Sequence, residues 1–89
     1  MSLMFVILFY DVDKKRVQKM LKTCRKYLVW QQNSVFEGEI TKANLEKLKH
    51  FINKIICDED SVVIYKLRTT KYSERVVLGE DKKEDTNFI

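Results

Sequence analysis

An unbroken apolar run from Leu3 to Tyr10 ends at Asp11, and this run is the feature that most constrains the fold. A strand that is apolar at every position is normally covered on both faces and lies in the centre of its sheet. The run is far shorter than the ~20 residues that a membrane-spanning helix needs. Ligands of open α/β sheets lie beyond the carboxyl ends of the strands, so Asp11 is the first candidate for chemistry.

The length of 89 residues predicts one small domain with a limited core, and pairing of two copies would bury further apolar surface. We expect this domain to cover residues 1–79, with a charged tail over residues 80–89 that has little to bury. No secretory signal is evident, which favours a cytoplasmic protein. Cys24 and Cys57 lack metal-ligand or disulfide spacing, so we expect reduced thiols in the core.

Apolar residues then recur with a helical period from about Asp13 to Tyr27, and Asp13 is a suitable N-cap. The β-branched and aromatic residues from Leu28 to Ile40 surround a polar centre and predict two short strands joined by a tight turn. Gly38 lies inside this segment and predicts a bulge or a bend.

The second half of the chain repeats the pattern of helix and strand. Thr41 is a suitable N-cap for a second helix, whose apolar period runs to Ile56 before acidic residues 58–60 interrupt it. A strong strand over residues 61–67 and a short one over residues 75–78 follow. The order of these elements predicts an α+β, ferredoxin-like (split βαβ) fold with an additional C-terminal strand, and this fold alone implies no activity.

The first helix should carry a segregated positive charge, since no carboxylate occurs from Lys14 through Phe36 in a chain of net charge +4. Its cations are Lys14, Lys15, Arg16, Lys19, Lys22, Arg25 and Lys26. Lys15, Lys19, Lys22 and Lys26 follow the spacing i, i+4, i+7, i+11 and form a ridge that suits a row of phosphates. A solvated surface that serves only solubility is the alternative interpretation. The missing acids favour nucleic acid, bound with weak sequence preference.

Cations in the first turn of a helix oppose the macrodipole, at a cost of roughly 0.3–1 kcal/mol each. Lys14, Lys15 and Arg16 occupy that turn, so an anionic partner would relieve the mismatch.

Phosphodiester hydrolysis would require Asp11 to bind a divalent cation, and a single carboxylate per chain is a small ligand set for such an ion. A two-fold axis that placed Asp11 of each protomer side by side would supply a pair. Asp13 follows closely, but helix capping is its simpler role. Alternatively, Asp11 only satisfies the backbone of the following turn, and Tyr10 either donates a hydrogen bond or packs.

Three other side chains are weaker candidates for function. His50 lies in the second helix without a partner at ligand or base spacing, which favours a surface histidine. Trp30 and Phe36 have rings that would suit base stacking, although aromatic residues in strands are more often core or interface anchors.

Three segments together carry a more specific pattern: the apolar strand that ends in Tyr10-Asp11, the block Gln32-Asn33-Ser34-Val35-Phe36-Glu37-Gly38, and the strand Asp60-Ser61-Val62-Val63-Ile64-Tyr65-Lys66-Leu67. In order and spacing they resemble the small CRISPR-associated endoribonuclease family, the smaller partner of the adaptation integrase. The likeness covers about Met4 to Leu67.

The resemblance implies a ferredoxin-like homodimer in which the last strand of one chain extends the sheet of the other. It implies a metal-dependent endonuclease for RNA or duplex DNA in antiviral defence and spacer acquisition, with Asp11 of both chains flanking a cation such as Mg²⁺ at the dyad. Asp11 would be both the catalytic and the metal-binding residue, and Tyr10, Arg16, Ser34 and Phe36 would support it. The alternative role is a non-catalytic, DNA-binding scaffold that bridges integrase dimers.

The chain departs from the family pattern in its cations. The family often has an arginine just before its Gln-x-Ser step, where this chain has Trp30-Gln31, and arginines after the aspartate appear here partly as Lys14 and Lys15. Lysine binds phosphate as a point charge without the bidentate fork of arginine. Phosphate binding is therefore expected, whereas clamping of a transition state is not implied.

Overall fold

The computed structural model describes residues 3–69 and 72–80, and the side chains of residues 68–74 are outside this description. The elements are β1 (Leu3–Asp11), α1 (Lys14–Arg25), β2 (Val29–Gln32), β3 (Val35–Thr41), α2 (Lys42–Ile55), β4 (Ser61–Thr69) and β5 (Tyr72–Gly79). They form one sheet in the order β2-β3-β1-β4-β5, and each neighbouring pair is antiparallel. The predicted α+β, ferredoxin-like fold with an additional C-terminal strand is confirmed.

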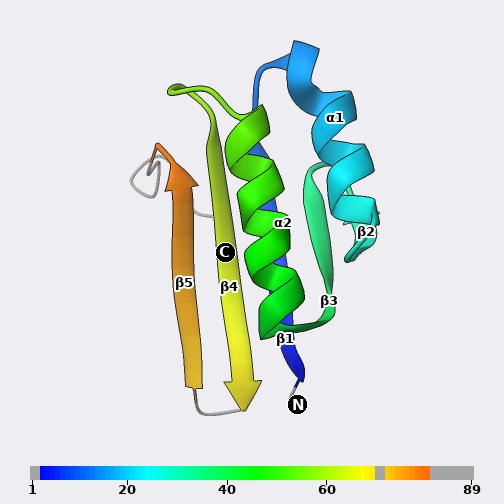
Figure 1. Cartoon of the computed structure of the whole chain (residues 1–89), viewed down its shortest axis with the longest axis vertical. Helices are drawn as coiled ribbons and strands as arrows, with labels where there is room; N and C mark the ends of the chain where they lie inside the picture. The colour runs from blue at the N-terminus through cyan, green and yellow to red at the C-terminus, as the bar shows by residue number, and fades with distance from the viewer. Residues whose placement is uncertain (1–2, 70–71, 81–89) are drawn as a thin grey trace.

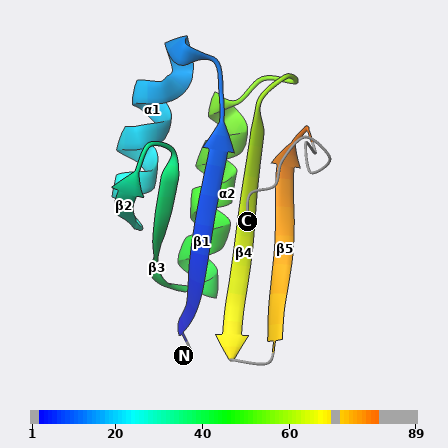
Figure 2. The ribbon, with the colours of Figure 1, turned by 180° about the vertical axis from the view of Figure 1, so that it is seen from behind.

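Both helices lie on one face of the sheet (Figure 1), and the view from behind shows none of the described helices over the other face (Figure 2). The side chains of β1 alternate accordingly: Met4, Val6, Leu8 and Tyr10 are buried, whereas Leu3 is 57% exposed. The expectation that β1 is covered on both faces is therefore wrong for the single chain. An apolar run shows that both faces avoid water, but it does not show what covers each of them.

The helices begin at the caps that the sequence predicts. The Asp13 carboxylate accepts a hydrogen bond from the Lys15 backbone N–H at 3.1 Å, and the Thr41 hydroxyl accepts one from the Asn44 N–H at 3.1 Å. Each side chain satisfies a backbone donor that has no partner inside its helix. The largest fully buried side chains come from strands and helices alike, and they include Leu8, Met20, Phe36, Leu45, Leu48, Ile52 and Ile64.

The tight turn between β2 and β3 is confirmed, with Asn33 in the left-handed region at φ 45°. Asparagine tolerates this conformation better than most residues do. Gly38 adopts φ 154°, a backbone conformation that other residues rarely adopt, but it keeps regular register opposite Val6. The register shift lies in β2 instead, between Trp30 and Gln32.

The last strand is longer than predicted and pairs with β4 of its own chain, with Ser61 opposite Gly79. The strand exchange implied by the family resemblance involves two chains and stays a prediction. Gly79 adopts φ 84°, and the next residue, Glu80, donates its backbone N–H to the Asp60 carbonyl at 2.9 Å. The charged tail lies mostly outside the described residues.

The prediction that both cysteines lie in the core is confirmed for Cys24 and wrong for Cys57. Cys24 is buried, and this burial raises the pKa of its thiol to about 12, whereas Cys57 is exposed.

Neither described helix is both long and apolar enough to cross a membrane.

Candidate functional site

Asp11 is the last residue of β1, and its side chain is exposed. Because successive side chains of a strand point to opposite faces, Asp11 lies on the same face as Phe5, Ile7 and Phe9, the face away from α1 and α2. It is paired with Ser61 at the start of β4. The carboxylate therefore sits at the tip of an apolar strip.

A depression of about 270 Å³ opens beside Asp11 and is lined by Tyr10, Asp11, Val12, Val17, Asn33 and Ser34. The Tyr10 backbone N–H donates to the Ser34 carbonyl at 3.1 Å, which draws the β2–β3 turn against the end of β1. The structure thus brings together Asp11 and Ser34, two predicted site residues far apart in sequence. Asn33, which the sequence did not single out, joins them.

Tyr10, which lines this depression, and Phe36 both belong to the core. Their rings stack with centroids 6.2 Å apart, Phe36 is fully buried, and burial raises the pKa of the Tyr10 hydroxyl. Of the alternatives open from sequence, packing describes both residues. They support the end of β1 from below.

The cations of α1, apart from Arg16, lie at the surface of the helix as predicted: Lys14, Lys15, Lys19, Lys22, Arg25 and Lys26. The helix has no acidic residue in its first turn, and its last turn includes Lys22 and Arg25. These side chains therefore form a positive surface along α1, which we call the α1 basic surface.

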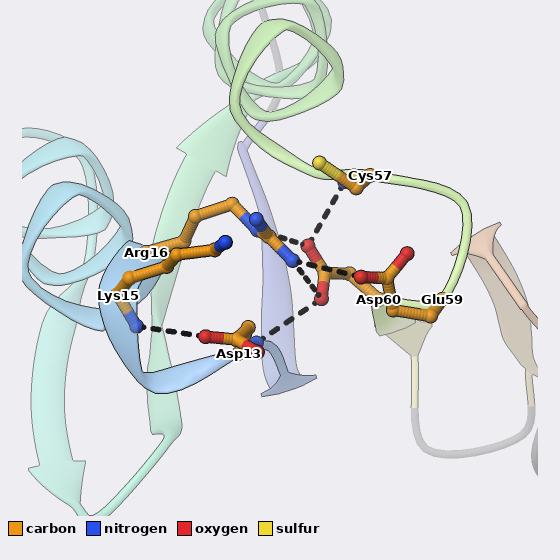
Figure 3. Close-up of polar contacts among 6 residues, drawn as sticks. All are labelled: Asp13, Lys15, Arg16, Cys57, Glu59 and Asp60. Atoms are coloured by element: carbon orange, nitrogen blue, oxygen red, sulfur yellow. Dashed lines mark hydrogen bonds and ion pairs between the residues drawn. The ribbon is translucent and has the colours of Figure 1, made fainter.

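Arg16 is committed to acidic partners of the chain itself (Figure 3). Its Nε lies 2.6 Å from Oδ2 of Asp60, its Nη2 lies 3.1 Å from Oδ1, and the same Nη2 lies 3.3 Å from Oε2 of Glu59. The Arg16 side chain is only 13% exposed. The predicted role of Arg16 in nucleic-acid binding stays a prediction, but its guanidinium already has a planar carboxylate partner.

Asp60 is the site residue that local sequence patterns do not reveal. Its side chain is 1% exposed and also accepts the backbone N–H of Asp13 at 3.1 Å and that of Cys57 at 2.9 Å. Hydrogen bonds from Arg16 and from these amides hold the pKa of Asp60 at about 2, below its ordinary value, although burial acts against this. In turn, Asp60 raises the pKa of Arg16.

The buried carboxylate links α1, the segment after α2 and the start of β4 (Figure 3). It also offsets the unfavourable placement of cations in the first turn of α1, because it supplies an anion at the N-terminus of that helix. The sequence offers one signal, an acidic residue placed directly before a strongly apolar strand. Taken alone, the acidic run of residues 58–60 indicates only the end of the second helix.

The described residues contain no group of three or more His, Cys, Asp or Glu side chains able to hold a metal ion. The depression is nevertheless lined by Asp11, Asn33 and Ser34, residues with side-chain oxygens of the kind that hard divalent cations prefer. The donor chemistry therefore fits Mg²⁺, while one chain supplies a single carboxylate.

The remaining candidates lie on the surface. His50 is exposed on α2, with its ring 5.8 Å from that of Phe51, as expected for a surface histidine. Trp30 is 45% exposed on β2, and its indole Nε1–H donates to the Asn33 carbonyl at 2.9 Å.

A sequence model of the family described as CRISPR associated protein Cas2 matches residues 4–75. The chain belongs to the Cas2 family. The resemblance deduced from the Asp11 strand and the two later segments is thereby confirmed. Its Cas2 relative from Dictyoglomus turgidum, named CRISPR-associated endoribonuclease Cas2, is 57% identical over 87 residues, which is 97% of this chain and 100% of the relative.

Solved Cas2 structures share the fold. One described as a crystal structure of Cas2 superposes with a TM-score of 0.74 at 43% identity and covers 91% of this chain and 92% of its own. The crystal structure of Streptococcus pyogenes Cas2 at pH 6.5 gives a TM-score of 0.62 at 28% identity, covering 97% and 99%.

Proposed function

We propose that this Cas2-family chain is a CRISPR-associated, metal-dependent endonuclease that acts as a homodimer on RNA or duplex DNA. The observation that carries the proposal is the placement of Asp11, an exposed carboxylate at the tip of β1, beside a depression with further oxygen donors. The name of the Dictyoglomus turgidum relative, an endoribonuclease, supports the reaction class.

The face of the sheet away from the helices supports a dimer. Phe5 and Leu3 are exposed there, and the ring of Phe9 meets the edge of the Tyr65 ring at 5.9 Å between centroids. Contiguous apolar surface of this kind marks an interaction site in soluble proteins. Because Asp11 ends the same face, a two-fold axis near that end would bring the Asp11 carboxylates of both chains together.

In such a dimer, Asp11 of each chain would hold the cation, and Ser34 and Asn33 line the same depression. When bound, a divalent cation neutralises charge on the phosphate and lowers the pKa of a coordinated water. The lysines of the α1 basic surface would hold the flanking phosphates as point charges. Tyr10 and Phe36 keep the strand end fixed through core packing.

A second function is favoured by the α1 basic surface itself, which lies on a different element from Asp11. A dimer with two such surfaces would hold duplex DNA without cleaving it, and it would dock the CRISPR integrase as a scaffold in spacer acquisition. In that case hydrolysis at Asp11 would be incidental.

The test compares wild type with Asp11→Asn, with the triple variant Lys15→Glu/Lys19→Glu/Lys22→Glu and with Asp58→Asn, a control at another exposed carboxylate. Cleavage of a single-stranded RNA and of a duplex DNA is followed in Mg²⁺ and in EDTA. We expect Asp11→Asn to abolish cleavage and keep binding. The triple variant should bind duplex DNA more weakly, and its salt slope should fall by about 0.9 for each phosphate that it no longer neutralises.

Undiminished cleavage by rigorously purified Asp11→Asn protein would refute the enzymatic proposal. A protein that binds duplex DNA through the lysines and never cleaves, in any metal, would act as the scaffold. Unchanged affinity and salt slope in the triple variant would refute both functions for the α1 basic surface.

A further inference from the structure

Trp30 is an exposed aromatic side chain that the proposed function leaves without a role. It is 45% exposed on the edge strand β2, next to the still more exposed Val29. Tryptophan presents a large apolar ring, and exposed tryptophans in proteins commonly serve as binding anchors. The question is which partner suits this ring.

The indole ring is held in a fixed orientation. Its Nε1–H donates to the carbonyl of Asn33 at 2.9 Å, so the polar edge of the ring is satisfied by the chain itself. Asn33 occupies the left-handed turn between β2 and β3 and lines the depression that contains Asp11. The ring is therefore hydrogen-bonded directly to a residue that lines the candidate active site.

The cations nearest to Trp30 in the sequence lie at the end of α1, shortly before β2. α1 and β2 are in contact, and Figure 1 shows them side by side, with the end of α1 leading into β2. The last turn of α1 includes Lys22 and Arg25, Lys26 caps it, and no carboxylate occurs between residues 14 and 36. An exposed aromatic ring on a strand in contact with a cationic helix is typical of surfaces that bind single-stranded nucleic acid, where bases stack and the backbone meets positive charge.

The face on which Trp30 lies keeps it accessible in the proposed dimer. Trp30 is opposite Phe36 in the β2–β3 pairing, and Phe36 is buried beneath the helices, so Trp30 belongs to the helix side of the sheet. The apolar face proposed for the second copy is the opposite one. Dimer formation therefore does not cover the indole ring.

We propose that Trp30 is a stacking platform for an unpaired base of a single-stranded RNA or DNA whose backbone runs along the α1 basic surface toward Asp11. This inference rests on the proposed function and deepens it by naming Trp30, outside the depression at Asp11, as a base-binding residue. A base inside a duplex is already stacked on its neighbours, so a duplex offers this surface only its phosphates.

The test uses intrinsic fluorescence, because Trp30 is the single tryptophan of the chain. The full-length protein in EDTA is titrated with oligouridylate, with oligodeoxythymidylate, with a duplex DNA of equal length, and with heparin, which carries negative charge and no bases. We expect both single strands to quench the fluorescence, and duplex and heparin to bind without matching quenching.

Affinity is measured in parallel by anisotropy of labelled strands. Trp30→Ala should weaken single-strand binding by about 5- to 150-fold, the range that corresponds to the removal of one stacked base, and leave duplex binding within about twofold. Trp30→Phe should restore most of the affinity because it keeps a ring. Urea unfolding of both variants identifies any weakening that comes from misfolding.

Equal quenching by single strand, duplex and heparin would overturn the proposal, and so would unchanged single-strand affinity in Trp30→Ala. The outcome is separable from that of the proposed function. Stacking is measured in EDTA and again in Asp11→Asn, two conditions in which we expect no cleavage. If no nuclease activity is found, the Trp30 result can therefore still be interpreted. If Trp30 does not stack on bases, metal-dependent cleavage at Asp11 is unaffected.

Discussion

The Arg16–Asp60 ion pair gives a stability prediction whose size follows from the structure. Asp60→Asn keeps the shape of the side chain and one oxygen acceptor but removes the charge that meets Arg16 at 2.6 Å. Arg16 and the two amides together lower the pKa of Asp60 to about 2. Each pKa unit corresponds to ~1.4 kcal/mol, so we expect the variant to lose about 2–3 kcal/mol at pH 7.

The pH dependence of this destabilisation has a definite sign. The carboxyl group has a pKa of about 3.9 in the unfolded chain and a lower one in the folded chain, so its contribution is complete well above pH 4 and is lost as the pH falls toward 2. At pH 3 the contribution should be roughly half of its value at pH 7. The difference between wild type and Asp60→Asn must therefore shrink on acidification.

The assay is urea unfolding by circular dichroism at a fixed protein concentration, from pH 7 down to pH 3. Glu59→Gln is the matched control, because Glu59 is the other carboxylate that contacts Arg16 and its side chain is 69% exposed. Exposed pairs contribute about 0–1 kcal/mol, so this control should behave nearly as wild type. An Asp60→Asn penalty below that of Glu59→Gln, or one that stays constant from pH 7 to pH 3, would refute the reasoning.

Two further predictions concern the same region. Gly79→Ala should destabilise the fold by about 1–3 kcal/mol in urea unfolding, because Gly79 has φ 84° and an added Cβ would overlap the Asp60 carbonyl oxygen; the neighbouring Glu80→Ala should not. Arg16→Gln should lower the urea midpoint of unfolding but leave the slope of log affinity for duplex against log salt unchanged. Lys15→Gln should do the opposite: its stability should stay within about 0.5 kcal/mol of wild type, and its salt slope should fall by about 0.9. The reverse result would show that Arg16 contacts phosphate.

Local patterns are sufficient for much of the fold. The caps at Asp13 and Thr41 each need only residues two or three positions away, and the apolar periods that follow them extend over one helix. The tight turn after β2 likewise depends on its own residues. These features are predictable because the interactions that create them are short-range in sequence.

The errors arise where the partner lies far along the chain or outside it. Arg16 counts as one more helix cation in the sequence because its partner Asp60 is 44 residues away, and no local pattern pairs them. The outer face of β1 is predicted to be buried because Phe5, Ile7 and Phe9 have the composition of a core. An apolar composition indicates that this face is shielded from water, and a second chain can shield it as well as a helix can.

Asp60, which sequence patterns did not reveal, helps to explain how one Asp11 carboxylate from each chain can form a site shared by two chains. A site assembled from two chains binds well only if each chain already presents its ligand in place, since ordering costs would otherwise weaken association. Asp60 meets this need from both sides of the strand end: its carboxylate holds the Asp13 amide just after Asp11, and its carbonyl accepts the Glu80 N–H at the end of β5. The following residue, Ser61, is the β4 partner of Asp11. The segments on both sides of Asp11 are thus held by contacts of the buried Asp60, and for this reason we expect the proposed nuclease to need Asp60 for the geometry of its site, while Asp11 holds the cation.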